Sequence, residues 1–453
     1  MMFESRNPAT GQVIKTYPSL TTGEIDKKLD LAWKAWKTWS NTKFAERTAL
    51  LSRMAELLEA RVETYAQLIV MEMGKPIGEA QAEVKKAASG CRHFAEAGED
   101  YLKPMAIPGL NAKVVYESTG PVFGIMPWNL PFWQVLRFFV PLAMVGNTVL
   151  VKHAETVQGC AAALEQLVRD AGGPEGLYVN FPITREAVPA VIADARVRSL
   201  TVTGSIPVGR LIAQIAGQHG KKAVLELGGS DPFLVFEDAN LDKAVAMGVL
   251  SRYSNNAQSC IAAKRFYVAE SIADKYIAAF VEKAKSLKVG DPMKTDTQLG
   301  PLARADIRTN TERQVTAAKG LGAKLLTGGA SIDGPGYYYA PTVMTGLPGN
   351  APLAQEEFFG PVALMSTFKT EQEAIDLANS TDYGLAATVW SGDTDRAARV
   401  AGKIEAGAVF INDFVRSDPR APFGGVKGSG FGRELGALGA RELTNAKLIF
   451  TGG

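Results

Sequence analysis

Cysteine and histidine are scarce in this chain of 453 residues, which contains three of each. Cys91, Cys160 and Cys260 lie far apart, and neither a Cys-x-x-Cys pair nor a histidine cluster accompanies them. This spacing excludes a disulfide framework and provides no metal-ligating motif, so we expect no bound metal. Few, scattered cysteines are typical of a reducing compartment, and we expect a cytoplasmic protein.

Excess charge and long apolar runs are missing as well. The 49 basic and 47 acidic residues leave a net charge of +2, which gives no reason to expect nucleic acid or a membrane surface as a partner. The first residues are polar and lack the apolar core of a secretory signal. The longest apolar stretch, residues 130–146, is interrupted by Gln134, Arg137 and Pro141 and is too short to span a bilayer comfortably.

The chain is longer than the size at which one hydrophobic core usually divides, so we expect two or more domains. Apolar residues recur every three or four positions from residue 22 to about residue 103, which predicts helices that end near Pro104 and Pro108. Short strands such as "TVLVKHA" and "KAVLELGG" then alternate with helical segments. A second alternating set of strands and helices begins after "LELGGSDP", which places a domain boundary near residue 228. This order predicts an α/β fold with mostly parallel sheets.

A third, smaller element is expected from two distant segments. "AKVVYESTGPVFGIMP" predicts strands with turn residues, and "ARELTNAKLIFTGG", residues 440–453, predicts an exposed strand. Strands from 103–119 and 434–453 could together form a projecting β element, which favours an oligomer.

Cys260, in the stretch "SNNAQSCIAAKR", is the first candidate for chemistry. Alone, it could equally be a small buried hydrophobe or a nucleophile. A thiol that attacks a carbonyl needs donors for the developing oxyanion and a base for the later step. Asn129 offers an amide in the proline-flanked loop "MPWNLPF", and Glu226 offers a carboxylate at the end of an apolar strand. Taken alone, Asn129 could be an ordinary turn residue, and Glu226 could be a solvated strand terminus.

In this order and context, these residues resemble the aldehyde dehydrogenase superfamily. The resemblance covers nearly the whole chain, and the motifs that carry it are "PWNLP", "VTGS", "LELGGSDP", "NNAQSCIAAKR", "EEFFGPV" and "PFGGVKGSG". Together with the pattern above it implies a Rossmann-like NAD(P)-binding domain, an α/β catalytic domain and a small β oligomerisation element. The expected bounds are 1–102 with 120–227, then 228–433, then 103–119 with 434–453. A homodimer or homotetramer is expected.

The resemblance also implies a mechanism in which an aldehyde is oxidised to a carboxylic acid with NAD(P)+. Cys260 would attack the aldehyde carbon, and the oxyanion of the thiohemiacetal would lie between the Asn129 amide and the Cys260 backbone N–H. Hydride transfer to the nicotinamide would leave a thioester, and Glu226 would activate the water that hydrolyses it. A variant that transfers the acyl group to coenzyme A would gain nothing from such a base. Cys91 and Cys160 lie among alanines in helical patterns and are interpreted as structural.

Cofactor binding is implied at several matching positions. No GxGxxG follows the first strand of the sheet, but "TGSIPVG" places a glycine turn at a helix N-terminus, where backbone N–H groups can bind a pyrophosphate. Without the resemblance, these glycines could belong to an ordinary turn, and the Glu357 and Phe359 side chains could be a helix-terminal acid and a core aromatic. The resemblance assigns the cofactor to Trp128, Lys152, Glu155, Gly204, Ser205, Glu357 and Phe359.

Glu155 bears on the choice between the two nicotinamide cofactors. Its carboxylate can accept hydrogen bonds from both ribose hydroxyls and would repel a 2′-phosphate. We therefore expect NAD to be preferred, with NADP possible because Lys152 is close by in "VKHAE".

The substrate is indicated by Arg137, an arginine inside an apolar helix start. It either has a structural acidic partner or faces the substrate tunnel and binds a carboxylate. Its position resembles the substrate-carboxylate arginine of the succinate-semialdehyde dehydrogenase branch, and Ser417 could donate to the same carboxylate. Ser254 stands where that branch often has a second arginine. We expect succinate semialdehyde as substrate; the alternative is a broad-range aliphatic aldehyde dehydrogenase in which Arg137 is structural.

Overall fold

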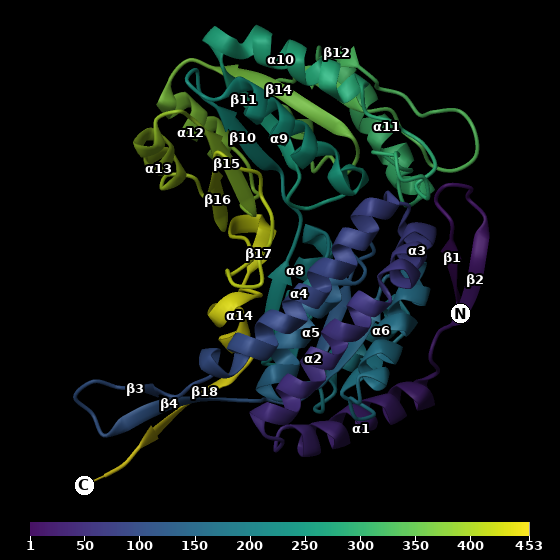
Figure 1. Cartoon of the computed structure of the whole chain (residues 1–453), viewed down its shortest axis with the longest axis vertical. Helices are drawn as coiled ribbons and strands as arrows, with labels where there is room; N and C mark the ends of the chain where they lie inside the picture. Colours follow the sequence, from purple (N-terminus) through teal and green to yellow (C-terminus); the bar gives the residue numbers. More distant parts are fainter. Residues whose placement is uncertain (453) are drawn as a thin grey trace.

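The computed structural model describes residues 1–452 and contains two large, mainly parallel sheets with helices against them (Figure 1). This confirms the expected α/β fold class. The first sheet has the strand order β17-β9-β8-β5-β6-β7, in which only β17 is antiparallel to its neighbour. Its strands are β5 (Val122–Met126), β6 (Val149–His153), β7 (Tyr178–Asn180), β8 (Ser199–Thr203), β9 (Lys222–Glu226) and β17 (Gly430–Phe431).

The second sheet has the order β12-β13-β14-β11-β10-β15-β16 and is parallel except for β12. The chain passes from the first sheet to the second between β9 and β10. The strands are β10 (Asp231–Val235), β11 (Ala263–Ala269), β12 (Lys324–Thr327), β13 (Thr342–Thr345), β14 (Val362–Phe368), β15 (Ala386–Trp390) and β16 (Ala408–Ile411). Most positions of the central strands in both sheets are buried, as is typical of parallel sheets that are covered on both faces.

Helices connect the strands in both halves and precede the first sheet. The helices of the first half are α1 (Thr22–Trp39), α2 (Phe44–Ala60), α3 (Val62–Met73), α4 (Ile77–Tyr101), α5 (Trp133–Val145), α6 (Gln158–Asp170), α7 (Val188–Ala193) and α8 (Ile206–Gln218). The helices of the second half are α9 (Leu241–Tyr253), α10 (Glu270–Lys285), α11 (Ala305–Gly320), α12 (Glu371–Asn379) and α13 (Thr394–Ala401). No helix of residues 1–452 combines the length and the apolar character needed to cross a bilayer.

A third, antiparallel sheet projects from the body and carries the C-terminal end of the chain (Figure 1). It consists of β3 (Met105–Ala106), β4 (Ala112–Glu117) and β18 (Asn445–Phe450). The expectation of a strand over the whole of residues 440–453 was wrong at its start, because residues 440–442 belong to helix α14 (Gly436–Glu442). Alanine, leucine, arginine and glutamate in "GALGARE" favour a helix despite its two glycines, and the strand begins only at Asn445. The N-terminal strands β1 (Met2–Arg6) and β2 (Val13–Pro18) form a separate pair.

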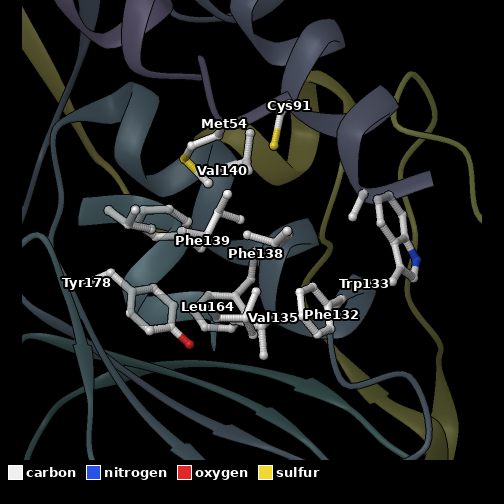
Figure 2. Packing of buried hydrophobic residues seen from close by; sticks show 14 of the residues in the cluster. Met54, Cys91, Phe132, Trp133, Val135, Phe138, Phe139, Val140, Leu164 and Tyr178 are labelled. Atoms are coloured by element: carbon white, nitrogen blue, oxygen red, sulfur yellow. The ribbon is translucent and has the colours of Figure 1, made fainter. Parts of the chain in front are cut away.

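Helix α5 is the buried centre of the first half, and every one of its residues is buried. Figure 2 shows Val140 of α5 near Met54 of α2 and Cys91 of α4, and Phe139 near Tyr178 of β7. Cys91 is fully buried in this core, which agrees with a structural role. Because α5 directly follows the loop that contains Asn129, this packing fixes one wall of the site described next.

Candidate active site

The carboxyl ends of β5, β8 and β9 meet beside the loop that precedes β11, and together they enclose a cavity of about 370 Å³. Ligands commonly bind at such strand ends in α/β sheets. The structure brings most of the predicted site residues to this one cavity: Trp128, Asn129, Gly204, Ser205, Glu226, Cys260, Glu357 and Phe359.

The loop that carries Cys260 has an unusual backbone. Asn255, Asn256 and Ala257 have φ angles of 58°, 54° and 61°, in the left-handed region that costs non-glycine residues free energy. Hydrogen bonds hold this turn in place. The backbone N–H of Asn255 donates to Glu79 Oε2 at 2.7 Å, and the Asn256 amide donates to the carbonyl oxygens of Gly74 and Pro301, both at 2.8 Å.

Asn129 is connected directly to that loop. Its Nδ2 donates to the backbone oxygen of Gln258 at 3.0 Å, two residues before Cys260. In return, Asn255 Nδ2 donates to the backbone oxygens of Asn129 at 3.0 Å and Gln258 at 2.9 Å. An amide nitrogen has two N–H groups, so Asn129 keeps a second donor for an oxyanion.

Glu226 is a buried carboxyl group, 2% exposed, at the end of β9. Neither of its carboxylate oxygens has a hydrogen-bond partner within residues 1–452. Burial raises its pKa well above the ordinary value, nearby Glu434 adds to this, and the positive charges of Arg137 and Arg433 oppose it. A buried carboxyl group with a raised pKa and no hydrogen-bond partner among the described residues is a candidate general base.

The Cys260 thiol is also shifted toward its neutral form. Burial raises its pKa to about 11, and the charges of Arg137 and Lys264 act in the opposite direction. Lys264 is fully buried and lies close to Cys260, since its Nζ donates to the backbone oxygens of Ser259 at 2.9 Å and Cys260 at 2.8 Å.

Five of the seven residues expected at the cofactor line this cavity, and the groups they offer are compatible with a nicotinamide dinucleotide. Gly204 and Ser205 precede α8, and the side chain of Ser205 makes no capping hydrogen bond there, so the N–H groups at this helix terminus are not used by that side chain. Glu357 forms an ion pair with Lys264 at 3.2 Å and accepts a hydrogen bond from the backbone N–H of Gly229. Phe359 packs edge-on against Trp128, with ring centroids 5.8 Å apart.

Lys152 and Glu155 lie at the carboxyl end of β6 and are not part of the cavity lining. Lys152 is buried, and burial is the main cause of its lowered pKa. Glu155 is partly exposed, and Arg185 Nε lies 3.7 Å from its Oε1.

Arg137 and Ser417 also lie outside the lining of the Cys260 cavity. Arg137 is 3% exposed, forms an ion pair with Glu434, donates to Thr203 Oγ1 at 3.2 Å and lies over the ring of Phe423. Glu434 is the structural acidic partner that the sequence left open, so the charge of Arg137 is compensated inside the chain. Arg137 was expected to bind a substrate carboxylate, but in the structure it pairs with an acidic residue of its own chain. This is the other possibility stated from the sequence, in which Arg137 has a structural partner. The Ser417 hydroxyl accepts hydrogen bonds from Lys86 and Trp133.

The model of the aldehyde dehydrogenase family matches residues 1–449. The chain belongs to this family. It is 44% identical to a "Probable succinate-semialdehyde dehydrogenase" of Synechocystis sp., named for NADP(+), over 99% of this chain and 100% of that protein. It is 43% identical to the NAD(P)+ succinate semialdehyde dehydrogenase Sad of Escherichia coli K12, over 98% of this chain and 97% of that protein. The solved succinic semialdehyde dehydrogenase of Streptococcus pyogenes, in complex with NADP+, is 36% identical, with a TM-score of 0.97 and full coverage of both chains.

Membership in the aldehyde dehydrogenase family confirms the resemblance stated from the sequence motifs. The enzyme is an NAD(P)-dependent aldehyde dehydrogenase. A nicotinamide cofactor and an aldehyde substrate follow from this, and the cavity around Cys260 is where the residues predicted for such chemistry meet.

Sequence reasoning missed several residues around this cavity. Lys264 could have been identified from the sequence, because the charged pair "KR" interrupts an otherwise apolar strand. Gln134 is 1% exposed, lines the cavity, and its Oε1 has no partner within residues 1–452. Glu83 accepts hydrogen bonds from the backbone N–H groups of Phe132 and Trp133, which begin α5. Nothing local in the sequence of α4 indicates this contact.

Proposed function

We propose that this aldehyde dehydrogenase oxidises succinate semialdehyde to succinate, with Cys260 as nucleophile. The observation that carries the chemistry is the meeting of Cys260, Asn129 and Glu226 in one cavity. The substrate is supported by the relatives, several of which are named succinate-semialdehyde dehydrogenases and match this chain over nearly its full length.

In the proposed reaction, Cys260 Sγ gives its proton to solvent water and forms a bond to the aldehyde carbon. The oxyanion accepts hydrogen bonds from the free N–H of the Asn129 amide and from the backbone N–H of Cys260. The chemistry that a bound nicotinamide cofactor supplies is acceptance of hydride from that carbon, which leaves a thioester on Cys260. Glu226 then takes a proton from the water that attacks the thioester, and the acid is released as the thiolate leaves.

The substrate proposal is tested by comparing the specificity constant for succinate semialdehyde with that for butanal, a neutral aldehyde of the same chain length. NAD(P)H absorbance gives both values. We expect kcat/KM to be at least ~10-fold higher for the acid, because one charge-assisted contact contributes ~1.5–3 kcal/mol. Equal values would refute the proposal and favour the broad-range alternative with Arg137 structural.

We further propose a preference for NAD over NADP, supported by Glu155 alone. The relatives are named for NADP(+) or for NAD(P)+, so Glu155 is the specific reason to expect a difference in this chain. Replacing Glu155 with serine removes the repulsion of a 2′-phosphate and leaves Arg185 without its nearby carboxylate. We expect the NADP to NAD ratio of kcat/KM to rise by ~10-fold or more; an unchanged ratio would show that other residues decide the preference.

Two features of the whole chain complete the proposal. A cytoplasmic location is supported by the three cysteines, which are all free thiols. A homodimer or homotetramer assembled through the β3-β4-β18 sheet is supported by the apolar side chains that this sheet exposes, among them Leu448 and Phe450.

A further inference from the structure

Lys86 of α4 lies in a small polar cluster with Trp133 and Ser417. Its Nζ donates to Ser417 Oγ at 2.8 Å and lies 4.8 Å from the centre of the Trp133 ring. Trp133 Nε1 donates to the same Ser417 Oγ at 3.0 Å. Figure 2 shows Trp133 at one end of α5, apart from the packing around Phe139 and Tyr178.

The charge of Lys86 has no acidic partner within residues 1–452. The carboxylates in its surroundings are engaged elsewhere, Glu83 with Lys75 and Asp418 with Arg420. Burial lowers the pKa of Lys86 to about 8, and the nearby charge of Arg137 acts in the same direction, while Glu83 and Asp418 oppose the shift. A partly buried ammonium group next to a neutral hydroxyl and a ring is stabilised when an anion compensates its charge.

Donors are also left over in this cluster. Ser417 is 8% exposed, and its oxygen accepts from both Lys86 and Trp133, so its own O–H must point to another acceptor. An ammonium group has three N–H donors, and Lys86 uses one of them on Ser417. A hydroxyl donor and a positive charge with spare N–H groups are matched by a group that only accepts hydrogen bonds, such as a carboxylate.

The cluster adjoins the catalytic residues from two directions. Trp133 begins α5 four residues after Asn129, and the next residue, Gln134, lines the Cys260 cavity. Ser417 belongs to the segment that continues to Phe423 and Gly424, and these three residues share a neighbouring cavity of about 450 Å³. A Cβ atom placed on Gly424 would lie 2.6 Å from Glu226 Oε1, so this segment reaches the catalytic base.

We propose that Lys86, together with the Ser417 hydroxyl, binds the remote carboxylate of the substrate, and that Lys86 rather than Arg137 is the cation that selects an acid semialdehyde. This inference rests on the proposed function, since it needs a substrate with a carboxylate. It assigns selectivity to α4, a helix that none of the motifs includes.

The test compares Lys86→Met, a neutral side chain of similar length, with the wild-type enzyme on succinate semialdehyde and on butanal. We expect KM for the acid to rise by ~10- to 100-fold, while kcat for the acid and kcat/KM for butanal stay within about twofold. Lys86→Arg keeps the charge and should recover most of the affinity for the acid. Lys85→Met removes an exposed lysine from the next position of the same helix and should change neither substrate.

Succinate provides a second readout that does not depend on turnover of the acid. With butanal as substrate, succinate should inhibit the wild-type enzyme competitively, and Lys86→Met should weaken this inhibition by a similar factor. Ser417→Ala should raise KM for the acid by a smaller factor, about 3- to 10-fold. The inference is supported if these variants lose affinity for succinate semialdehyde and succinate but keep their activity on butanal.

If Lys86→Met lowered kcat/KM equally for both aldehydes, the inference would be overturned, because Lys86 would then only support the fold. Unchanged KM for the acid in Lys86→Met would overturn it as well. In both cases a wild-type preference for succinate semialdehyde over butanal would leave the proposed function intact. If the wild-type enzyme itself shows no preference for the acid, both the proposed substrate and the inference fail.

Discussion

Cys260 and Glu226 are both shifted toward their uncharged forms by burial, although the proposed reaction uses each of them as an anion. The pKa of the thiol is about 11 and that of the carboxyl group is raised well above its ordinary value. Arg137 and Lys264 lower the thiol pKa, but burial outweighs them. Before substrate and cofactor bind, the site therefore holds a weakly reactive thiol, which protects it from oxidation and alkylation because the thiolate is the reactive form.

This protection can be measured as a pH dependence. Since only the thiolate reacts, the rate of alkylation of the cofactor-free enzyme by iodoacetamide should rise about tenfold per pH unit and continue to rise above pH 9. An ordinary cysteine, with a pKa near 8.5, would level off there. Mass spectrometry locates the modified residue, and the fully buried Cys91 and Cys160 serve as internal controls that should remain unmodified. A plateau below pH 9 would contradict the prediction.

Helix α4 is the element that holds the two halves of the catalytic site together. Glu79 accepts from the backbone of the nucleophile loop at Asn255, and Glu83, one turn further, accepts from the first N–H groups of α5. Lys75 forms a buried ion pair with Glu83. Because α5 follows Asn129 directly, one helix sets the position of the proposed oxyanion donor and of the loop that carries the proposed nucleophile.

The contribution of Glu79 can be separated from general folding by two substitutions. Glu79→Ala leaves the N–H of Asn255 without its acceptor, in a turn whose backbone is already strained. A loss of ~1.5 kcal/mol in positioning corresponds to a ~10-fold decrease in kcat. Glu79→Gln retains an acceptor oxygen and should stay within ~3-fold of the wild-type kcat.

Glu96→Ala, at an exposed position of the same helix, is the matched control and should have no effect. Equal kcat values for Glu79→Ala and the control would show that the turn does not depend on this contact. Loss of thermal stability in Glu79→Ala without a change in kcat would assign Glu79 a purely structural role.

At the element scale, the sequence predicts what is encoded locally. Alternating strands and helices, the glycine turn before α8, and Asn129, Glu226 and Cys260 in their motifs are visible in short stretches. The acidic partner of Arg137 cannot be recognised in any short stretch. Glu434 lies near the other end of the chain, and only the return of β17 to the first sheet brings it close to Arg137. Glu83 and Lys86 were missed for the same reason, since contacts from distant segments determine what their charges do. Lys264 differs, because its hydrogen bonds go to Ser259 and Cys260, which are close to it in the sequence.

At the scale of the whole molecule, the β3-β4-β18 sheet joins the end of the chain to a segment more than three hundred residues earlier. β18 pairs with β4 from Asn445 opposite Glu117 to Phe450 opposite Ala112. Neither face of β18 is covered, because Leu448 and Phe450 on one face are 59% and 61% exposed and Ile449 on the other is 40% exposed. These exposed apolar side chains in a projecting sheet are the observation that supports the proposed oligomer.

If the proposed oligomer assembles through this sheet, the double substitution Leu448→Asp and Phe450→Asp should convert it to monomers. Placing two carboxylates in an apolar contact leaves them without compensating partners, which costs several kcal/mol at each copy of the interface. Light scattering coupled to size-exclusion chromatography measures the mass of each species directly. Lys113→Gln, at an exposed polar position of the neighbouring strand β4, is the control and should keep the wild-type mass. If the double variant remained folded by circular dichroism and kept the wild-type mass, the subunits would assemble through another surface.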